Sequence, residues 1–390
     1  MTLCGRETEI RRIAEDCMVD RLVILTSEPG LGVTGLLEWG VQPALRQQGL
    51  ITLTYRHWQG KSFVAAFKEA IAAAVREQTG EAFFAQTETL KEMLDRIRLG
   101  TRRSVALLLD QFEDYLRCHA GTGLSDSFDA ELSHAIAGRS ARFVVALQNH
   151  SVKPFERFSQ CIPNLLGHRL SLAPLTPGAA RDAVRAEAAR RGMEVEPDVV
   201  EALIACQAAA FKDGVHPFFL MRGVARLLDA SSLLQSTVVH RATLEGNGGA
   251  ERLILESLDT AIDELNPTRT ELLFRWCNIL LSKDRERPSL TRMAVTEKAL
   301  TDYAGKLNRF VPTTLPLLLQ MGLLRSVEMQ DAIRYEIARE CFTPIVRDWW
   351  QRREAFLIAR RRAKFRVRSM SIAAGCIVAL YAAWLLGALK

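Results

Sequence analysis

The chain has 390 residues, of which 25% are charged and 48% hydrophobic. This length allows two or three separate cores, and the composition excludes a largely disordered chain. The formal net charge is +6. However, residues 347–368 hold nine Arg or Lys against two acids, so the rest of the chain is close to neutral. Basicity confined to one segment argues against a nucleic-acid-binding body, and we expect no nucleic-acid partner.

The N-terminus and the cysteines indicate a cytoplasmic body. Charged residues from Arg6 to Arg12 occupy the place where a signal peptide would have its apolar region. The eight cysteines form no C-x-x-C pair, and no histidine lies near them at zinc spacing. We therefore expect reduced thiols.

The first motif is a glycine-containing loop at Ser27–Leu37, directly after an apolar run. A G-x-x-x-x-G-K-[ST] loop wraps the β-phosphate with backbone N–H groups. Its Lys reaches the β- and γ-oxygens, and its hydroxyl contacts Mg²⁺. Gly32 and Thr34 stand where the second Gly and the Ser/Thr belong, whereas Val33 replaces the Lys. An ordinary strand-to-helix turn is the alternative interpretation of this segment.

The second motif is Val105–Asp114, an apolar run that ends in acids. This is the form of a Walker B strand. There, one carboxylate organises Mg²⁺ and a later one orients water. Asp110 and Glu113 are the candidates for these two roles. A solvated loop after a buried strand is the alternative.

Together with the two motifs, the pattern of apolar residues predicts an α/β P-loop NTPase with a parallel sheet, then a helical subdomain, a winged-helix domain and one C-terminal transmembrane helix. Short strands alternate at first with helical stretches such as Phe63–Glu77 and Thr87–Arg98, and the strands stop at Pro177. Later, helices are followed by a two-stranded hairpin over 323–338. The predicted boundaries are 1–175, 176–250, 251–355, a basic juxtamembrane segment at 356–368, and the transmembrane helix at 369–389. The predicted strands are Leu22–Thr26, Ile51–Tyr55, Val105–Leu109, Phe143–Leu147 and Arg169–Leu172.

Residues 369–389 contain no charge, and about 20 apolar residues match a hydrocarbon core of about 30 Å. Basic residues precede this segment and favour membrane lipid as a partner. A buried C-terminal helix is the alternative. We expect a single-pass protein of the cell (inner) membrane with most of the chain in the cytoplasm. Small residues every four positions from Ser371 to Gly387 favour self-association of the helix. The basic residues are Arg360, Arg361, Arg362, Lys364, Arg366 and Arg368.

Five landmarks in order give the chain a resemblance to the STAND NTPases, in the branch called novel STAND NTPase 1. Cys4–Glu9 resembles the entry motif G-R-E-x-E, and the loop at Ser27–Leu37 follows it. Arg56 comes after the second strand, and Asp110–Glu113 has the branch's D-Q-F-E form. Residues 335–350 resemble the segment that closes the family's winged helix, with Arg339 where His is usual. The resemblance covers residues 1 to about 362.

The resemblance implies ATP and Mg²⁺ as ligands. Mg²⁺ would be held by Thr34 and Asp110, and Glu113 would be the catalytic base if the site is active. The family's sensor position is usually Arg, and here it is Gln148. The nucleotide-binding residues would be Gly5, Arg6, Gly30, Gly32, Val33, Thr34 and Gln148.

Two cations are thus missing from the expected site, and each is worth roughly 10²–10³ in rate. The leading hypothesis is a membrane-anchored, STAND-like signalling or scaffold protein. It would act as a nucleotide- or partner-controlled switch rather than an efficient NTPase. One alternative is an active ATPase that uses Glu113 with a cation supplied in trans. Another is a tail-anchored adaptor that binds no nucleotide.

Overall fold

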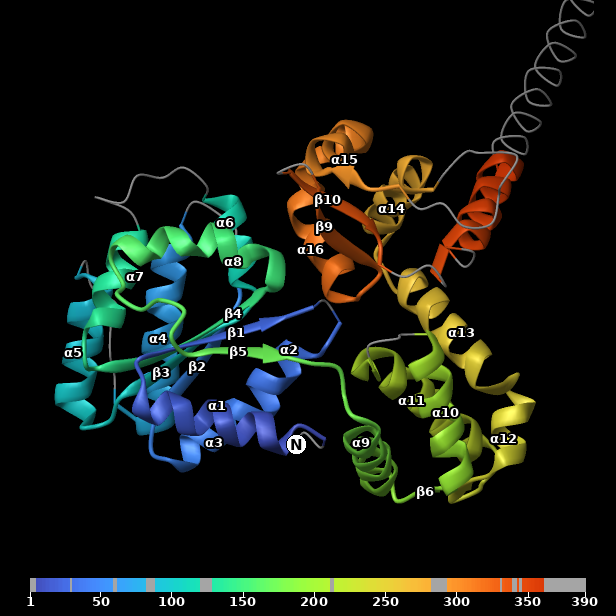
Figure 1. The fold of residues 1–390 in the computed structure, drawn as a ribbon, viewed down its shortest axis with the longest axis horizontal. Coiled ribbons are helices and arrows are strands. Elements are labelled where there is room, and N and C mark those ends of the chain that lie inside the picture. The colour runs from blue at the N-terminus through green and yellow to red at the C-terminus, as the bar shows by residue number, and fades with distance from the viewer. Residues whose placement is uncertain are drawn as a thin grey trace, which may run out of the picture.

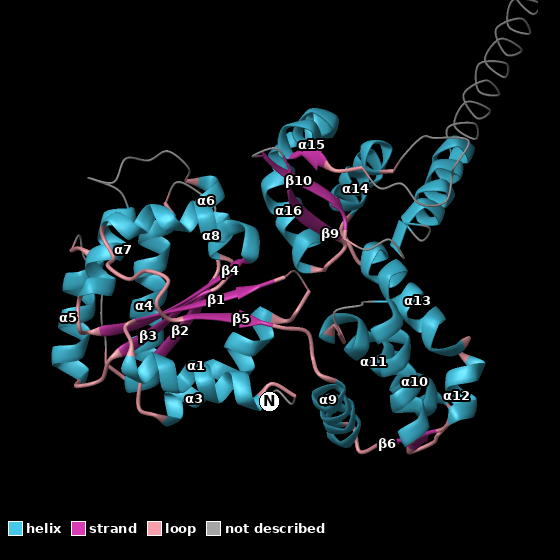
Figure 2. Ribbon diagram, viewed as in Figure 1, coloured by secondary structure: helices cyan, strands magenta, loops and turns pink. Residues whose placement is uncertain are grey.

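The computed structural model describes residues 5–28, 30–58, 62–81, 88–119, 128–210, 214–281, 293–329, 332–338, 342–343 and 346–360. These residues form three units, drawn in chain order from blue to red in Figure 1. The first unit is a sheet with helices on both faces, and the second is helical. The third combines helices with a small antiparallel sheet, and Figure 2 distinguishes these strands from the helices around them.

The sheet of the first unit is parallel and has the strand order β2-β3-β4-β1-β5. All five strands were predicted, and three have the predicted bounds. In this order β4 lies between β1 and β3, so the ends of these three strands are neighbours. The register pairs Ser27 with Gln148. The strands are β1 (Leu22–Ser27), β2 (Ile51–Tyr55), β3 (Val105–Leu109), β4 (Ala141–Gln148) and β5 (Arg169–Leu172).

Both faces of this sheet are buried, as an unbroken apolar strand such as β3 requires. Val105, Leu107 and Leu109 enter one core, and Ala106 and Leu108 enter the other. Two sets of helices cover the two faces. The first set is α4 (Phe63–Thr79), α5 (Leu90–Thr101), α6 (Phe112–Cys118), α7 (Phe128–Ala137) and α8 (Val152–Phe155), and the second is α1 (Glu7–Val19) and α3 (Gln42–Gln47).

The helix predicted to start at Thr87 begins later, at Leu90, and this boundary was wrong. Thr89 is the N-cap, because its side chain accepts from the Glu92 backbone while the Glu92 carboxylate accepts from the Thr89 backbone. Such a capping box satisfies two N–H groups that would otherwise have no partner, which fixes the start of the helix.

The second unit is the predicted helical one, with one correction. Strands do not stop at Pro177, because β6 (Glu194–Val195) and β7 (Val238–Val239) form a short parallel pair. The predicted boundary at 250 falls in the first turn of α13, which reaches from the second unit into the third. The helices are α9 (Pro177–Arg190), α10 (Pro197–Ala210), α11 (Pro217–Leu233), α12 (Arg241–Gly246) and α13 (Gly249–Asp263).

The third unit has an antiparallel sheet of order β8-β10-β9 packed on helices. The predicted hairpin is present as β9 (Leu324–Met329) and β10 (Ala332–Ile337), and β8 (Val295–Thr296) was not foreseen. The helices are α14 (Pro267–Leu280), α15 (Glu297–Ala304) and α16 (Val311–Gln320). A further helix over 346–360 is tied to α13, since Arg352 lies 2.6 Å from Asp259.

Among the described residues, no helix combines the length and apolar composition needed to cross a membrane. The predicted transmembrane segment 369–389 lies outside the described residues. So do Arg361, Arg362, Lys364, Arg366 and Arg368. Arg360 is described, and it is exposed at the end of the helix over 346–360.

Candidate nucleotide-binding site

A cavity of about 950 Å³ opens at the carboxyl ends of β1, β3 and β4. In open parallel sheets, ligands bind at the carboxyl edge where the strand order reverses. All three units contribute to the wall: the glycine loop and strand ends from the first, α9 and α11 from the second, and α16 from the third. Figure 1 shows this meeting of the units beside the end of β1.

The loop between β1 and the next helix has the backbone of a phosphate-binding turn. Gly30 has φ 81° and Gly32 has φ 79°, conformations that favour glycine. Helix α2 (Val33–Gly35) starts directly after Gly32 and continues as a π-helix over Leu36–Val41. The loop therefore leads its backbone N–H groups to the start of a helix, an arrangement suited to anions.

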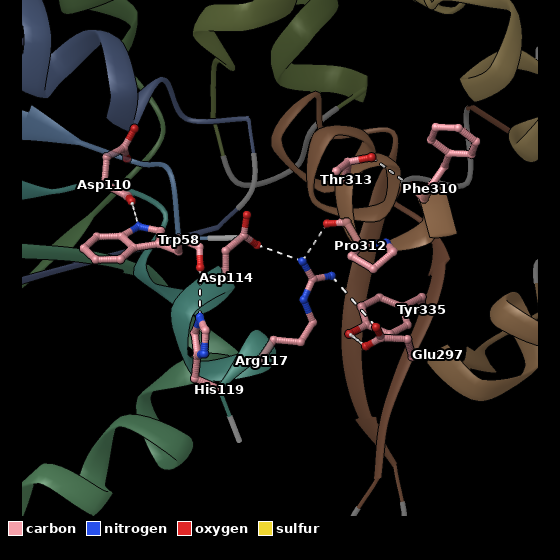
Figure 3. Close-up of polar contacts among 10 residues, drawn as sticks. All are labelled: Trp58, Asp110, Asp114, Arg117, His119, Glu297, Phe310, Pro312, Thr313 and Tyr335. Atoms are coloured by element: carbon pink, nitrogen blue, oxygen red, sulfur yellow. Dashed lines mark hydrogen bonds and ion pairs between the residues drawn. The ribbon is translucent and has the colours of Figure 1, made fainter. Parts of the chain in front are cut away.

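Thr34 and Asp110, the predicted Mg²⁺ ligands, are in direct contact. The Thr34 hydroxyl Oγ1 donates to Asp110 Oδ2 at 2.7 Å. Burial raises the pKa of the Asp110 carboxyl, and the hydrogen bond from Thr34 partly opposes this. The Asp110 carbonyl accepts from the buried Trp58 indole at 2.7 Å (Figure 3). Asp110 is thus held at both its backbone and its side chain.

Glu113 and Gln148 also line the cavity. Although Glu113 as a residue is only half-buried, its Oε2 is buried and has no hydrogen-bond partner among the described residues, and the same holds for Gln148 Oε1. Burial, reinforced by the negative charge of Asp114, raises the pKa of Glu113 to about 8. At neutral pH this carboxyl therefore holds a proton in the arrangement described, which is unfavourable for a general base.

The predicted entry motif also reaches this region. Arg6 is buried and lines the cavity, with Nη1 2.8 Å from Glu9 Oε1 and Nη2 donating to the Leu31 carbonyl at 3.5 Å. Gly5 has φ 82°, and a Cβ added there would lie 2.5 Å from the Ala179 carbonyl. Glycine is thus required where the chain passes α9.

Charge around the cavity is dominated by acids. Among the described lining residues only Arg6 and Arg190 are cationic, and each is paired with an acid on its own helix: Arg6 with Glu9 and Arg190 with Glu187. Val33 and Gln148 supply no charge. The acids that line the cavity are Glu28, Glu38, Asp110, Glu113 and Glu187.

The donor set suits Mg²⁺, because a hydroxyl and a carboxylate oxygen lie together at the end of β3. Magnesium in nucleotide sites takes one or two protein carboxylates and completes its shell with water and phosphate. In the part of the chain that the structure describes, no group of three or more His, Cys, Asp or Glu could hold a metal ion. Thr34 and Asp110 would hold the ion, and it would supply positive charge to the phosphates.

The sequence did not reveal the walls from the later units. Pro217, Phe218 and Met221 come from α11, and Pro316 and Leu317 from α16. Each has the pattern of an ordinary amphipathic helix, so only the packing of the units identifies it. The third unit also approaches the loop closely, because a Cβ on Gly30 would lie 3.5 Å from the Gly322 Cα.

The sheet order, the glycine turn and the contact between Thr34 and Asp110 define a P-loop NTPase fold. A family model for novel STAND NTPase 1 matches residues 2–370. The chain therefore belongs to the novel STAND NTPase 1 family.

Solved structures similar to this chain include archaeal and bacterial proteins. The Aeropyrum pernix ORC1 protein in complex with DNA has 18% identity and a TM-score of 0.49, with 92% of this chain and 94% of that chain covered. The Aeropyrum pernix ORC2 protein has 12% identity and a TM-score of 0.47 (90% and 95%). The Thermotoga maritima RuvB Holliday junction branch migration motor has 14% identity and a TM-score of 0.45 (87% and 94%). No curated protein matches the chain.

Proposed function

We propose that this protein is a membrane-anchored STAND-type switch or scaffold whose site holds a nucleotide with Mg²⁺ but hydrolyses it poorly. The observation that carries the proposal is the pairing of Thr34 with Asp110 at 2.7 Å, next to a loop in which Val33 stands in place of the Lys. The metal-binding half of the site is intact in its chemistry, whereas its phosphate-binding cations are absent.

Slow hydrolysis follows from the electrostatics of phosphoryl transfer. The transition state spreads negative charge over the equatorial oxygens and depends on nearby cations. Neither Val33 nor Gln148 can supply one, and the two arginines that line the cavity are engaged by acids. The raised pKa of Glu113 also disfavours proton removal from water.

An active ATPase is the second candidate, and Glu113 favours it. Its carboxyl reaches the cavity with one oxygen that has no described partner, as a water-orienting group would require. Activity would then need a cation from another molecule. A third candidate is an adaptor that binds no nucleotide. The acids that line the cavity favour it, because they repel phosphate groups.

We assign the third unit as a winged helix on the basis of its three helices and the β8-β10-β9 sheet, and we propose that it contacts protein rather than nucleic acid. The apolar segment 369–389 would anchor the chain in the inner membrane as a single span, with the body in the cytoplasm. Small residues in that segment would let two copies associate. Alkaline extraction of membranes tests the anchor, because a chain released by carbonate would contradict it.

The nucleotide assignment is tested on the full-length protein in detergent or vesicles. Labelled ATP is titrated with and without Mg²⁺, and phosphate release is followed in parallel. We expect Mg²⁺-dependent binding with negligible turnover, and Asp110→Asn should abolish the Mg²⁺ dependence.

Two results would contradict the proposal. Turnover that Glu113→Gln abolishes would establish the ATPase instead. Absence of binding at millimolar ATP and Mg²⁺ would leave the adaptor.

A further inference from the structure

Arg117 joins the first and third units directly beside the acids of the site. It lies in the last turn of α6, the helix that follows Asp110. Its Nη2 donates to Asp114 Oδ1 at 3.0 Å and to the Pro312 carbonyl at 2.9 Å. Its Nη1 lies 3.9 Å from Glu297 Oε1. Figure 3 shows one guanidinium between acceptors from two units.

On the first unit's side, Arg117 rests on a firmly held helix. The Phe112 ring packs edge-on against Trp58 at 5.1 Å, and the His119 Nε2 lies 2.9 Å from the Trp58 carbonyl. The beginning of α6 and the residue that caps its end are thus both fixed to the same tryptophan. Because α6 is held in this way, displacement of the third unit must break the contacts of Arg117 with Pro312 and Glu297.

On the third unit's side, the acceptor is the Pro312 carbonyl in the first turn of α16. In an α-helix each carbonyl receives the N–H of the residue four positions later. For Pro312 that residue is Pro316, which has no N–H to give. The Arg117 guanidinium donates to this carbonyl from another unit. A charged donor makes such a bond stronger than a neutral one would.

The contact at Pro312 fixes the start of a helix whose far end lines the cavity. Pro316, Leu317 and Met321 follow within about three turns and line the cavity. Gly322, next in the chain, lies against Gly30 of the loop. Holding the start of α16 therefore holds the third wall of the cavity in place.

We propose that Arg117 is a positioning residue that keeps the third unit closed over the site. It acts through the Pro312 carbonyl, with Asp114 orienting its guanidinium and Glu297 adding attraction across the interface. Tyr335 supports this arrangement, since its hydroxyl donates to Glu297 Oε2 at 3.4 Å. The consequence for ligand affinity rests on the proposed nucleotide function, whereas the closure itself does not.

Closure is tested by hydrogen exchange on the full-length protein without ligand. Arg117→Ala should raise amide exchange in residues 311–321 and 30–35 about tenfold or more, because the interface opens more often. Arg117→Lys keeps the charge but loses the forked guanidinium, and it should give an intermediate increase. Unchanged exchange in Arg117→Ala would overturn the proposal.

Arg103→Ala is the matched control. Arg103 is also half-buried and also donates to backbone carbonyls, those of Gly49 at 2.7 Å and Leu50 at 3.1 Å. These contacts lie inside the first unit at the opposite edge of the sheet. Exchange at 311–321 should stay at the wild-type rate, and an increase equal to that of Arg117→Ala would mean a general loss of stability and would overturn the proposal.

Glu297→Gln provides a second variant should Arg117→Ala fail to fold. Glutamine keeps an acceptor for the Tyr335 hydroxyl but removes the charge that attracts Arg117 across the interface. We therefore expect exchange in residues 311–321 and 30–35 to rise, by less than in Arg117→Ala. Exchange equal to that of the wild type would contradict the attraction between Arg117 and the third unit.

Titration with Mg-ATP separates this proposal from the proposed function. We expect Arg117→Ala to weaken binding about tenfold. If the wild type binds no nucleotide, the proposed function fails, and the exchange experiment still decides the role of Arg117. If the interface loosens while the affinity is unchanged, closure of the third unit does not contribute to nucleotide affinity, and that part of the inference is wrong.

Discussion

The two halves of the candidate site differ in how they are built. At the end of β3, Asp110 is held by the Thr34 hydroxyl at its carboxylate and by the Trp58 indole at its carbonyl. At the loop and at the end of β4, Val33 and Gln148 stand where we predicted cations, and Gln148 Oε1 is buried with no hydrogen-bond partner among the described residues.

This difference shows that geometry and charge can be separated within one site. The loop keeps its glycine turns and its contact with β3, both of which also serve the packing of the unit. Cations at such a loop act on the phosphates, so a site that lacks them can keep its fold. A site of this kind can keep a metal and a nucleotide in place while losing most of its catalytic power.

The largest effect is expected from removing the side chain that supports the Asp110 backbone. Trp58→Ala deletes a fully buried indole, which should lower the free energy of unfolding by about 3–5 kcal/mol. It also leaves the Asp110 carbonyl without the indole donor. Denaturant unfolding of the full chain measures the effect.

Trp39→Ala is the control, because Trp39 is 46% exposed. Its effect on the free energy of unfolding should be within about 1 kcal/mol. Equal losses for the two tryptophans would mean that Trp58 gives Asp110 no particular support.

A second experiment tests the buried Glu113 carboxyl of the same cavity through the pH dependence of stability. The folded-state pKa of Glu113 is about 8 against an ordinary value of 4.5, so between these limits the folded state binds the proton that the unfolded state releases. Stability should therefore fall as pH rises from about 5 to about 8, by on the order of a few kcal/mol. Glu113→Gln should remove this loss, and should be more stable than the wild type at pH 9 but equal to it near pH 4.

Glu28→Gln removes an exposed acid from the same cavity and serves as the reference. Thermal midpoints from pH 5 to pH 9 compare the three proteins. A wild type whose midpoint follows the same pH profile as Glu113→Gln would refute the buried, protonated carboxyl.

The smallest effect is expected from adding a cation to the loop. Val33→Lys should raise the affinity for Mg-ATP about tenfold, since a charged hydrogen bond contributes about 1.5–3 kcal/mol. Adenosine should bind no more tightly, because it has no phosphate. Calorimetric titration measures both ligands.

Val33→Met adds length without charge and is the matched control. If Met and Lys change the affinity equally, the gain comes from packing, and the missing charge does not explain the weakness of the loop.

Much of the first unit could be read from the sequence. Continuous apolar runs such as Val105–Leu109 are required in a parallel sheet with both faces covered, and each predicted strand is present. The site residues near strand ends could be found for the same reason, since parallel strands present their carboxyl ends at one edge. The start of α5 was misjudged, because the capping box at Thr89 outweighed the apolar periodicity before it.

The rest depended on contacts between distant segments. The short pair β6 and β7 has only two residues in each strand, too few to give an alternating pattern. Arg117 has the spacing of a solvated helix residue, and nothing nearby in the chain points to Pro312, which follows 195 positions later. The pKa of Glu113 is likewise set by burial, which the sequence does not display.

The sequence by itself determined the order of the units, the strands of the sheet and the uncharged residues at positions 33 and 148, because these follow from local apolar patterns and residue identity. Only the tertiary structure decided that three units share one cavity and that a single arginine spans two of them. Such contacts arise from packing between segments far apart in the chain, and local sequence patterns do not specify which surfaces will meet.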